Sequence, residues 1–316
     1  MQSKSPSDTI TVKRNFHFET TVRSALQTFA TGLWGLAPLK ERCRELACYA
    51  IVCDLRKKAG AAGSTLIGLH SAFLGDPGTG KALAARRMGA LLFALGFLKR
   101  NRVVVATRDT LIGQYLGHTA PRTKSLLNSA EGGIFFLRQA PSLFKLDNPR
   151  DFGKEAVEIL LQYMENKRDT IVILLSGPKQ AMLDFFSANR GLSSRIANHI
   201  EFPPLTLNHL DRILTVQVAA AQYVIRPGAR ILFRQYLKRR RQIGLVADDA
   251  LFANGREVST FLQSLRPLLA ARLLSAFTQK LTVEDVMTYT VSDVFTLLKS
   301  SGVLAVDKRS NSSNRF

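Results

Sequence analysis

A glycine-rich loop between a short apolar run and a helix-forming stretch carries the clearest chemical signal of this sequence. The loop reads Gly75-Asp76-Pro77-Gly78-Thr79-Gly80-Lys81-Ala82 and fits the phosphate-binding pattern G-x-x-x-x-G-K-[ST] at every position except the last. Its glycines let backbone N–H groups converge on a pyrophosphate, Lys81 can reach the β- and γ-oxygens, and the following helix adds positive charge from its N-terminus. Ala82 lacks the hydroxyl that coordinates Mg²⁺ in this pattern. The sequence therefore predicts a phosphate-binding loop without its metal-binding hydroxyl.

The elements around this loop decide between a phosphate site and a chance glycine-rich turn before a helix. Short apolar runs, typical of strands covered on both faces, alternate with helical patterns, which predicts an α/β fold with a five-stranded parallel sheet in three layers. Ligands bind at the carboxyl ends of the strands in such a sheet, which favours the phosphate loop. The expected strands are Ala72–Leu74, Val103–Ala106, Gly133–Leu137, Thr170–Leu175 and His199–Phe202, and the expected helices are Lys81–Leu95, Thr119–Ala130, Asp151–Asn166 and Lys179–Asn189.

The chain is expected to divide near Pro203-Pro204, which we interpret as a hinge. We predict a basic, poorly ordered segment over 1–30, a nucleotide-binding α/β domain over 31–204 that includes an N-terminal helix at 36–58, a small helical domain over 205–300 and a disordered tail over 301–316. A transit segment within 1–30 is left open. The helices expected in the second domain are Leu207–Tyr223, Gly228–Arg240, Glu257–Phe277 and Val283–Leu298.

The charge balance is strongly basic, with 44 Lys and Arg against 24 Asp and Glu, a formal charge of +20 over 316 residues. This charge permits contact with nucleic acid, an anionic surface or an acidic partner, but no nucleic-acid motif accompanies it. The densest basic run, Lys238–Arg241, is either a solvated helix end or a binding patch. No run of 18 uncharged apolar residues predicts a membrane span. The three cysteines are odd in number and are expected to be small buried residues of a reducing compartment.

Four stretches carry a resemblance to a known family: TRDTLIGQYLGHTAPRTKSLL (107–127), DFGKEAVEILLQYMENKRD (151–169), NRGLSSRIANHIEFP (189–203) and FANGREV (252–258). They resemble the CbbX family of red-type Rubisco activases, which are AAA+ ATPases, over roughly residues 33–290. The resemblance implies a hexameric ring with ATP at subunit interfaces, ribulose bisphosphate as an effector, and a grip on the C-terminal tail of the Rubisco large subunit. Tyr115-Leu116-Gly117 matches the pore loop that would hold this tail. The segment GLSSRIANH resembles plastid-encoded members of the red lineage, so the expected location is the plastid stroma, with the bacterial cytoplasm as the alternative.

The acidic strand end of the family pattern is altered in this chain. Residues Gly132–Ala140 read GGIFFLRQA where the family reads GGVLFIDEA. By this resemblance, Arg138 replaces the aspartate that orients Mg²⁺, and Gln139 replaces the glutamate that polarises the attacking water. A guanidinium beside the metal site repels Mg²⁺, and a glutamine can hydrogen-bond a water but cannot accept its proton at neutral pH.

Several cationic contacts to phosphate are retained. Lys81 is present, Arg195 matches the arginine finger that acts in trans on the neighbouring subunit's nucleotide, and Arg256 matches the sensor arginine of the helical domain. Where the family usually has a second arginine three residues later, this chain has Ser259. The groups that act within the subunit are thus lost, while the group that acts on a neighbour remains.

We therefore expect the chain not to hydrolyse ATP by itself. Two alternatives stay open for binding: Arg138 lies near the phosphates, so that ATP or ADP binds without Mg²⁺, or Arg138 pairs elsewhere and the site stays empty. The first functional hypothesis is a non-catalytic subunit of a mixed ring with an intact CbbX paralogue, assisting Rubisco reactivation. The alternatives are an active ATP-hydrolysing activase, a repurposed basic protein that binds nucleic acid or an acidic partner, and a gene product without function.

Overall fold

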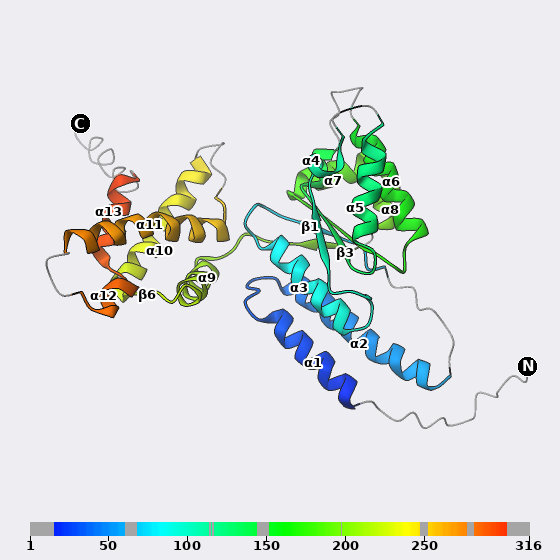
Figure 1. Ribbon diagram of the computed structural model, residues 1–316, viewed down its shortest axis with the longest axis horizontal. Helices are drawn as coiled ribbons and strands as arrows, with labels where there is room; N and C mark the ends of the chain where they lie inside the picture. Colours follow the sequence, from blue (N-terminus) through cyan, green and yellow to red (C-terminus); the bar gives the residue numbers. More distant parts are fainter. Residues whose placement is uncertain are drawn as a thin grey trace, which may run out of the picture. The chain divides into compact units, whose positions relative to one another are not determined.

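The computed structural model describes residues 16–60, 68–113, 115, 117–143, 152–196, 198–246, 252–276 and 281–301 (Figure 1). The chain forms two compact units. The first contains Met1–Asp76 and Gly80–Pro203, and the second contains Pro204–Phe316 together with the tip of the glycine loop, Pro77–Thr79. Each unit is described by itself.

The first unit is built on a five-stranded, wholly parallel sheet in the order β2-β3-β4-β1-β5. The predicted α/β fold with a five-stranded parallel sheet is confirmed. Both ends of every expected strand lie within two residues of the ends of an observed strand. Three of the five strands, β1, β3 and β4, are largely or wholly buried, as strands covered on both faces must be, whereas β2 and β5 lie at the two edges of the sheet. The strands are β1 Ser71–Leu74, β2 Val103–Ala106, β3 Ile134–Arg138, β4 Val172–Gly177 and β5 Asn198–Glu201.

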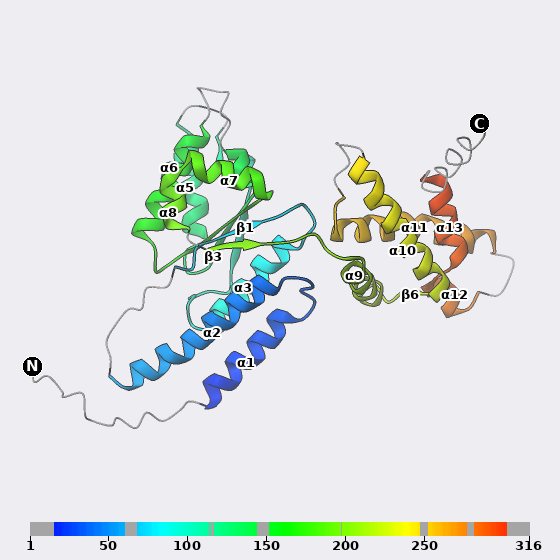
Figure 2. The same ribbon diagram turned by 180° about the vertical axis from the view of Figure 1, so that it is seen from behind.

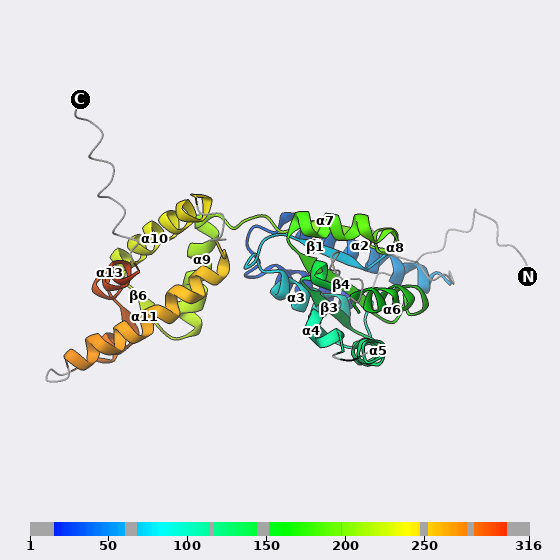
Figure 3. The same ribbon diagram turned by 90° about the horizontal axis from the view of Figure 1, so that it is seen from above.

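Side chains that alternate along each strand separate into two cores on opposite faces of the sheet. Phe73 and Phe136 join the core beneath α1, α2 and α3, whereas Ala72 and Phe135 join the core beneath α5, α6 and α7. Figure 2 shows these helices on the two sides of the sheet, which gives the three predicted layers, and Figure 3 views the same arrangement from above. The helices are α1 Phe16–Ala30, α2 Ala37–Lys58, α3 Lys81–Ala94, α4 Arg108–Leu111, α5 Thr119–Ser129, α6 Gly153–Asn166, α7 Lys179–Ala188 and α8 Arg190–Arg195, with a 3₁₀ turn at Ala140–Leu143.

Helix α1 differs from the sequence-based expectation of a poorly ordered segment over 1–30. Residues Phe16–Ala30 form a helix, and Val22 and Phe29 are buried in the core beneath α3. The end of this helix is capped from α3, because Arg87 Nη1 donates hydrogen bonds to the carbonyls of Thr28 (3.1 Å) and Phe29 (3.2 Å). Tertiary packing thus orders a stretch whose own pattern is weak. The rest of the predicted segment, residues 1–15, lies outside the described residues, as does the predicted tail beyond residue 301.

The second unit is a helical bundle with one short parallel β pair, β6 with β7. Its core is aromatic at the centre, where Phe233, Tyr236, Phe261 and Tyr289 are buried together. The elements are α9 Leu207–Ala220, β6 Val224–Ile225, α10 Pro227–Val246, α11 Gly255–Ser275, α12 Val283–Met287, β7 Thr288–Tyr289 and α13 Val291–Ser300. The predicted small helical domain is confirmed as a fold.

One predicted helix of the second unit, Val283–Leu298, is wrong. Strand β7 interrupts it, and Tyr289 is 1% exposed within the core. A new helix then begins at a cap, because the Thr290 N–H and hydroxyl both donate to the Asp293 carboxylate, at 2.8 and 2.9 Å. Arg272 reaches the same place from α11 and donates to the Thr288 carbonyl at 2.9 Å. Burial of one tyrosine and a capping box therefore outweigh the helical periodicity.

Candidate nucleotide site

The glycine loop leaves the sheet at the carboxyl end of β1, where a doubly covered parallel sheet binds its ligands. The Gly75 N–H donates to the Gly177 carbonyl at 3.0 Å. A Cβ on Gly75 would lie 2.3 Å from the Phe202 carbonyl oxygen, so only glycine fits here. Gly80 precedes α3 with φ of 95°, in the left-handed region that favours glycine. The backbone path thus explains two of the three glycines in the predicted loop.

Lys81 is the first residue of α3, and its ammonium group is turned onto the loop itself. Lys81 Nζ donates to the carbonyl oxygens of Gly75 (2.5 Å) and Asp76 (2.6 Å). These contacts hold the cation at the mouth of the loop, where the sequence predicts phosphate oxygens. Ala82 follows in the exposed first turn of α3 and offers only a methyl group. The loop therefore presents one ammonium and no side-chain hydroxyl at position 82.

The tip of the loop, Pro77–Thr79, is packed within the second unit. The Gly78 carbonyl accepts from the Gly255 N–H at 3.0 Å, and the Pro77 carbonyl accepts from Asn254 Nδ2 at 3.2 Å. A Cβ on Gly78 would lie 1.8 Å from the Ala253 carbonyl oxygen, so this glycine is needed for close approach. Thr79 is 2% exposed.

Asn254 organises this turn, and sequence reasoning did not single it out. The residue is 2% exposed and adopts φ of 49°, which asparagine tolerates better than most residues. Its Oδ1 accepts from the Leu205 N–H at 2.9 Å. Helix α11 begins directly afterwards at Gly255, which places the predicted sensor residue Arg256 exposed in the first turn.

Arg138 and Gln139 lie where β3 ends. Arg138 is the exposed last residue of the strand and pairs in register with Ser176 of β4. Within the described residues its side chain has no hydrogen bond or ion pair. Gln139 has φ of 51°, and its carbonyl accepts from the N–H (2.9 Å) and hydroxyl (2.7 Å) of Ser142. The strand end thus exposes a guanidinium and an amide where the family pattern has two carboxylates.

The sheet brings Arg138 to the same edge as the glycine loop. Because β4 lies between β3 and β1, two strand spacings of about 4.8 Å separate their carboxyl ends. Ser176, another residue that the sequence did not single out, lies on the intervening strand, is 3% exposed and donates to the Leu137 carbonyl at 3.2 Å. Its position at a strand end next to the loop is the signal that could have identified it. No group of three or more His, Cys, Asp or Glu side chains suited to a metal occurs in the described part of the chain.

Arg195 does not lie at this edge. It ends α8 just before the amino end of β5. The glycine loop follows the carboxyl end of β1, so the two lie at opposite ends of the parallel strands. Its Nη2 is 2.8 Å from Glu165 Oε2, and its Nη1 donates to the Gly191 carbonyl at 3.1 Å. The structure therefore separates Arg195 from the glycine loop of its own chain, as an in-trans role requires.

The predicted pore-loop residue Tyr115 is 67% exposed. Its ring meets the His118 ring edge-on, with centroids 5.5 Å apart, and Gly117 has φ of 81°. A Cβ on Gly113 would lie 2.4 Å from His118 Cβ, which shows how tightly this loop closes. Leu116, also predicted for the pore loop, lies outside the described residues.

Comparison with known proteins places these features in a family. The profile of the ATPase family associated with various cellular activities (AAA) matches residues 71–204, and that of the AAA lid domain matches residues 206–301. The CfxQ homolog of Trieres chinensis is 42% identical over 87% of this chain and 92% of its own length. The chain belongs to the CbbX family of AAA proteins. Its members include the chloroplastic ribulose bisphosphate carboxylase/oxygenase activase of Cyanidioschyzon merolae, 40% identical over 93% of this chain and 98% of that protein.

A bacterial relative and a solved structure agree with this family assignment. The plasmid-encoded CbxX protein of Cupriavidus necator is 44% identical over 77% of this chain and 74% of its own length. The AAA domain of FIGL-1, solved in complex with ADP, aligns with a TM-score of 0.55 at 13% identity over 92% of both chains, which shows the shared AAA fold. None of the helices that the structure describes has the length and apolar character to cross a membrane.

Proposed function

We propose that this CbbX-family protein binds adenine nucleotide without Mg²⁺, does not hydrolyse it alone, and serves as a subunit of a mixed ring that assists Rubisco reactivation. One observation carries the proposal. The carboxyl edge of the sheet keeps the phosphate lysine, Lys81, but presents Arg138 and Gln139 in place of carboxylates. This edge can hold negative charge and cannot direct a divalent cation.

The residues present do not fit Mg²⁺. Position 82 has no hydroxyl, an exposed guanidinium stands at the strand end, and no carboxylate follows it. ATP hydrolysis depends on charge placed around the γ-phosphate and on a positioned water. Removal of one such group costs roughly 10²–10³ in rate by analogy with oxyanion sites, and three changes in one site leave almost nothing although such losses are not additive.

The residues present fit a nucleotide better than they fit a metal. The N–H groups of the glycine loop and the Lys81 ammonium would hold the phosphates, and Arg138 would supply the positive charge that the metal otherwise provides. The exposed Arg138 side chain, without a partner in the described residues, supports this alternative over a pairing elsewhere.

The ring partner and the substrate are proposed from the relatives. The C. merolae relative is named a Rubisco activase, so we propose the C-terminal tail of the Rubisco large subunit as substrate, the exposed Tyr115 as a residue that grips it, and ribulose bisphosphate as effector. Arg195 would act on the nucleotide of an intact paralogue next to it in the ring. The plastid stroma is the proposed location, in line with the chloroplastic relative, and the bacterial cytoplasm is the alternative, in line with CbxX.

Two other functions remain as alternatives to test. An active ATPase would have to turn over with unusual metal geometry, and nothing at the strand end favours this. A basic binding protein would use surface charge, but α10, the most basic helix, already uses part of its charge internally. Arg230 pairs with Asp211 at 2.6 Å and Arg240 with Glu257 at 3.3 Å.

Calorimetric titration of the purified chain with ADP and ATP tests the binding proposal. We expect saturable heat in EDTA, unchanged or weaker binding when Mg²⁺ is added, and loss of the heat in Lys81→Ala. Absence of heat under both conditions would reject nucleotide binding. Binding that requires Mg²⁺ would favour the active-ATPase alternative instead.

A further inference from the structure

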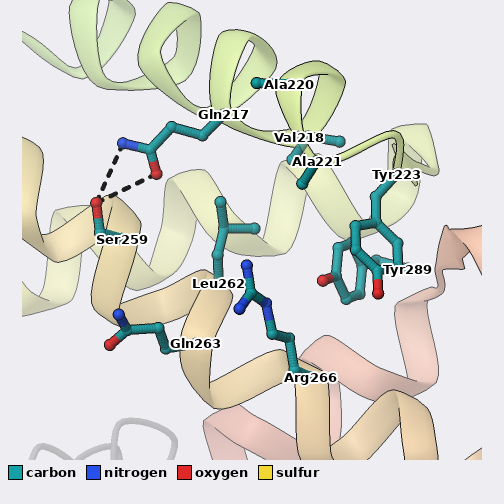
Figure 4. Close-up of a pocket in the computed structure, with 10 residues that line it drawn as sticks. All are labelled: Gln217, Val218, Ala220, Ala221, Tyr223, Ser259, Leu262, Gln263, Arg266 and Tyr289. Atoms are coloured by element: carbon teal, nitrogen blue, oxygen red, sulfur yellow. Dashed lines mark hydrogen bonds between the residues drawn. The ribbon is translucent and has the colours of Figure 1, made fainter.

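The second unit contains a pocket of about 320 Å³ between α9 and α11. Figure 4 shows its walls: Gln217 and Val218 from α9, Ser259 and Leu262 from α11, and the side chains of two tyrosines at one end. A volume of this size is at the lower limit of sites that enclose small molecules. All its lining residues belong to the second unit and none belongs to the glycine loop.

The end formed by Gln217 and Ser259 is polar and already satisfied. Gln217 Nε2 donates to Ser259 Oγ at 3.1 Å, and Ser259 Oγ lies 3.2 Å from Gln217 Oε1 (Figure 4). Leu262, which is 8% exposed, and Val218, which is 5% exposed, provide an apolar surface next to this pair. The pocket therefore offers an apolar wall with a fixed polar boundary.

The opposite end combines two phenols with a cation. The rings of Tyr223 and Tyr289 lie with centroids 4.9 Å apart and planes tilted by 32°. Figure 4 shows the guanidinium of Arg266 between Leu262 and this pair. Burial raises the pKa of Tyr289, and the neighbouring Arg266 guanidinium reduces this rise without cancelling it. The phenol therefore keeps its proton at neutral pH and can donate a hydrogen bond. No carboxylate pairs with Arg266 in the described part of the chain.

We propose that this pocket binds a small organic oxyanion, a phosphate or carboxylate on a short apolar or aromatic body, as a ligand distinct from the nucleotide. Arg266 takes the anionic group through charge-assisted hydrogen bonds, and the Tyr223 and Tyr289 hydroxyls are the neutral donors beside it. The body of the ligand packs against Leu262 and Val218. The inference does not depend on nucleotide binding, because it uses no residue of the glycine loop.

Ser259 makes room for this ligand. Its short side chain lines the pocket. An arginine side chain that starts from this position has the whole pocket within its reach and would bring its own cation to the site. The serine leaves the space open and leaves Arg266 as the cation that faces it.

Saturation-transfer NMR on the full chain, with phenyl phosphate and benzoate as probes, tests the proposal. We expect transfer from at least one probe, with the stronger one identifying phosphate or carboxylate as the preferred group. Loss of a hydrogen bond to a charged group predicts that Arg266→Gln weakens binding about tenfold or more. Ser259→Arg fills the pocket and should also abolish binding.

Matched controls separate the pocket from other cationic sites. Arg234→Gln removes a half-buried arginine that lies elsewhere in the same unit and donates to Asn208, so this variant should bind like the parent chain. Circular dichroism would verify that each variant is folded. No transfer from either probe at millimolar concentration would overturn the proposal. Transfer that survives Arg266→Gln and disappears in Lys81→Ala would place the probe in the glycine loop and would overturn it as well.

Discussion

Arg195 Nη2 lies 2.8 Å from Glu165 Oε2, so the predicted arginine finger is engaged with a carboxylate of its own chain. Glu165 lies near the end of α6 and Arg195 ends α8. Both precede the amino ends of strands, whereas the glycine loop follows the carboxyl end of β1. To act on the phosphate of a neighbouring subunit, the Arg195 guanidinium must break its ion pair with Glu165 and form one with that phosphate. Glu165 is thus a candidate positioning residue for the in-trans step.

Arg195→Ala in this chain is predicted to lower the ATPase rate of a ring mixed with an intact paralogue. An arginine finger supplied in trans accounts for roughly 10³–10⁵ in rate in other phosphoryl-transfer systems, so sites completed by this chain should become silent. The measurement is phosphate release from the mixed ring. Lys179→Ala, which breaks another exposed ion pair, with Glu201 at 2.6 Å, is the control and should leave the rate unchanged. An unchanged rate with Arg195→Ala would end the in-trans interpretation.

The stability of the chain should barely depend on that ion pair. The side chains of Arg195 and Glu165 are 33% and 66% exposed, and exposed pairs contribute about 0–1 kcal/mol. Glu165→Gln is therefore expected to leave the denaturation midpoint nearly unchanged, measured by urea unfolding, while it changes the mixed-ring ATPase. A large loss of stability would assign Glu165 a structural role instead.

Arg138→Ala should weaken nucleotide binding in EDTA and leave binding in Mg²⁺ equal or stronger. The exposed guanidinium at the end of β3 is the group that we expect to offset phosphate charge when no metal is present. Calorimetry with ADP gives the affinities, and Arg102→Ala, an exposed arginine before the amino end of β2, is the matched control. Equal affinities for Arg138→Ala and the parent chain would show that Arg138 does not contact the phosphates.

Asn254→Ala is expected to destabilise the second unit by about 1–3 kcal/mol, because it leaves the buried Leu205 N–H without its acceptor. It also removes the hydrogen bond to the Pro77 carbonyl, so the tip of the glycine loop loses a contact. Thermal and urea unfolding would measure the change. Asn208→Ala is the control, since Asn208 is exposed and its side-chain oxygen accepts a hydrogen bond from Arg234. Equal stability of the two variants would contradict this role for Asn254.

Acid should destabilise the first unit through His70, which is 6% exposed and directly precedes β1. Burial lowers the pKa of His70 from 6.5 to about 4, with a further decrease from Arg168 and an opposing contribution from the Met164 backbone. Its Nδ1 accepts from the Ile173 N–H at 3.0 Å. The unfolded chain therefore binds this proton at a higher pH than the folded chain does.

The sign follows from that difference. Stability contributed by the neutral imidazole is fully present above pH 6.5 and declines as the pH falls from 6.5 toward about 4, by about 3 kcal/mol in total. His70→Asn keeps an acceptor for Ile173 and should flatten this part of the pH dependence of unfolding. His118→Asn, an exposed control, should leave the slope as it is. An identical slope in His70→Asn and the parent chain would contradict the assignment.

Buried strands were the most predictable part of this fold. Phe73, Phe135 and Leu174 belong to short apolar runs bounded by polar residues, and a strand buried on both faces has no other sequence signature. Helix α1 was missed because its burial depends on α3, through Val22, Phe29 and the Arg87 cap, and local periodicity does not show such contacts. The break at Tyr289 was missed for the same reason.

The sequence predicted which residues carry the chemistry of the site, but it did not predict their hydrogen-bond and ion-pair partners. Glycine spacing identified Gly75 and Lys81, but no local pattern predicts that Lys81 binds its own loop carbonyls or that Arg195 meets Glu165, thirty residues away in sequence. Asn254 escaped notice because its role depends on a backbone conformation with positive φ and on partners distant in sequence, Leu205 and Pro77.

Restoring the lost groups is predicted to create activity. Ala82→Thr, Arg138→Asp and Gln139→Glu combined return the hydroxyl and both carboxylates to a loop that still has Lys81. We expect Mg²⁺-dependent phosphate release from this triple variant, with Arg195 completing each site in trans, and no release when Lys81→Ala is added. A triple variant that binds nucleotide and stays inactive would show that further positions limit catalysis.

Steady-state phosphate release from the purified, unmodified chain in Mg²⁺ and ATP tests the central claim most directly. The chain has no metal-binding hydroxyl at Ala82, no metal-orienting carboxylate at Arg138 and no water-polarising carboxylate at Gln139. This predicts a rate equal to that of Lys81→Ala, at the background of the assay. Sustained Mg²⁺-dependent release that disappears in Lys81→Ala would contradict it.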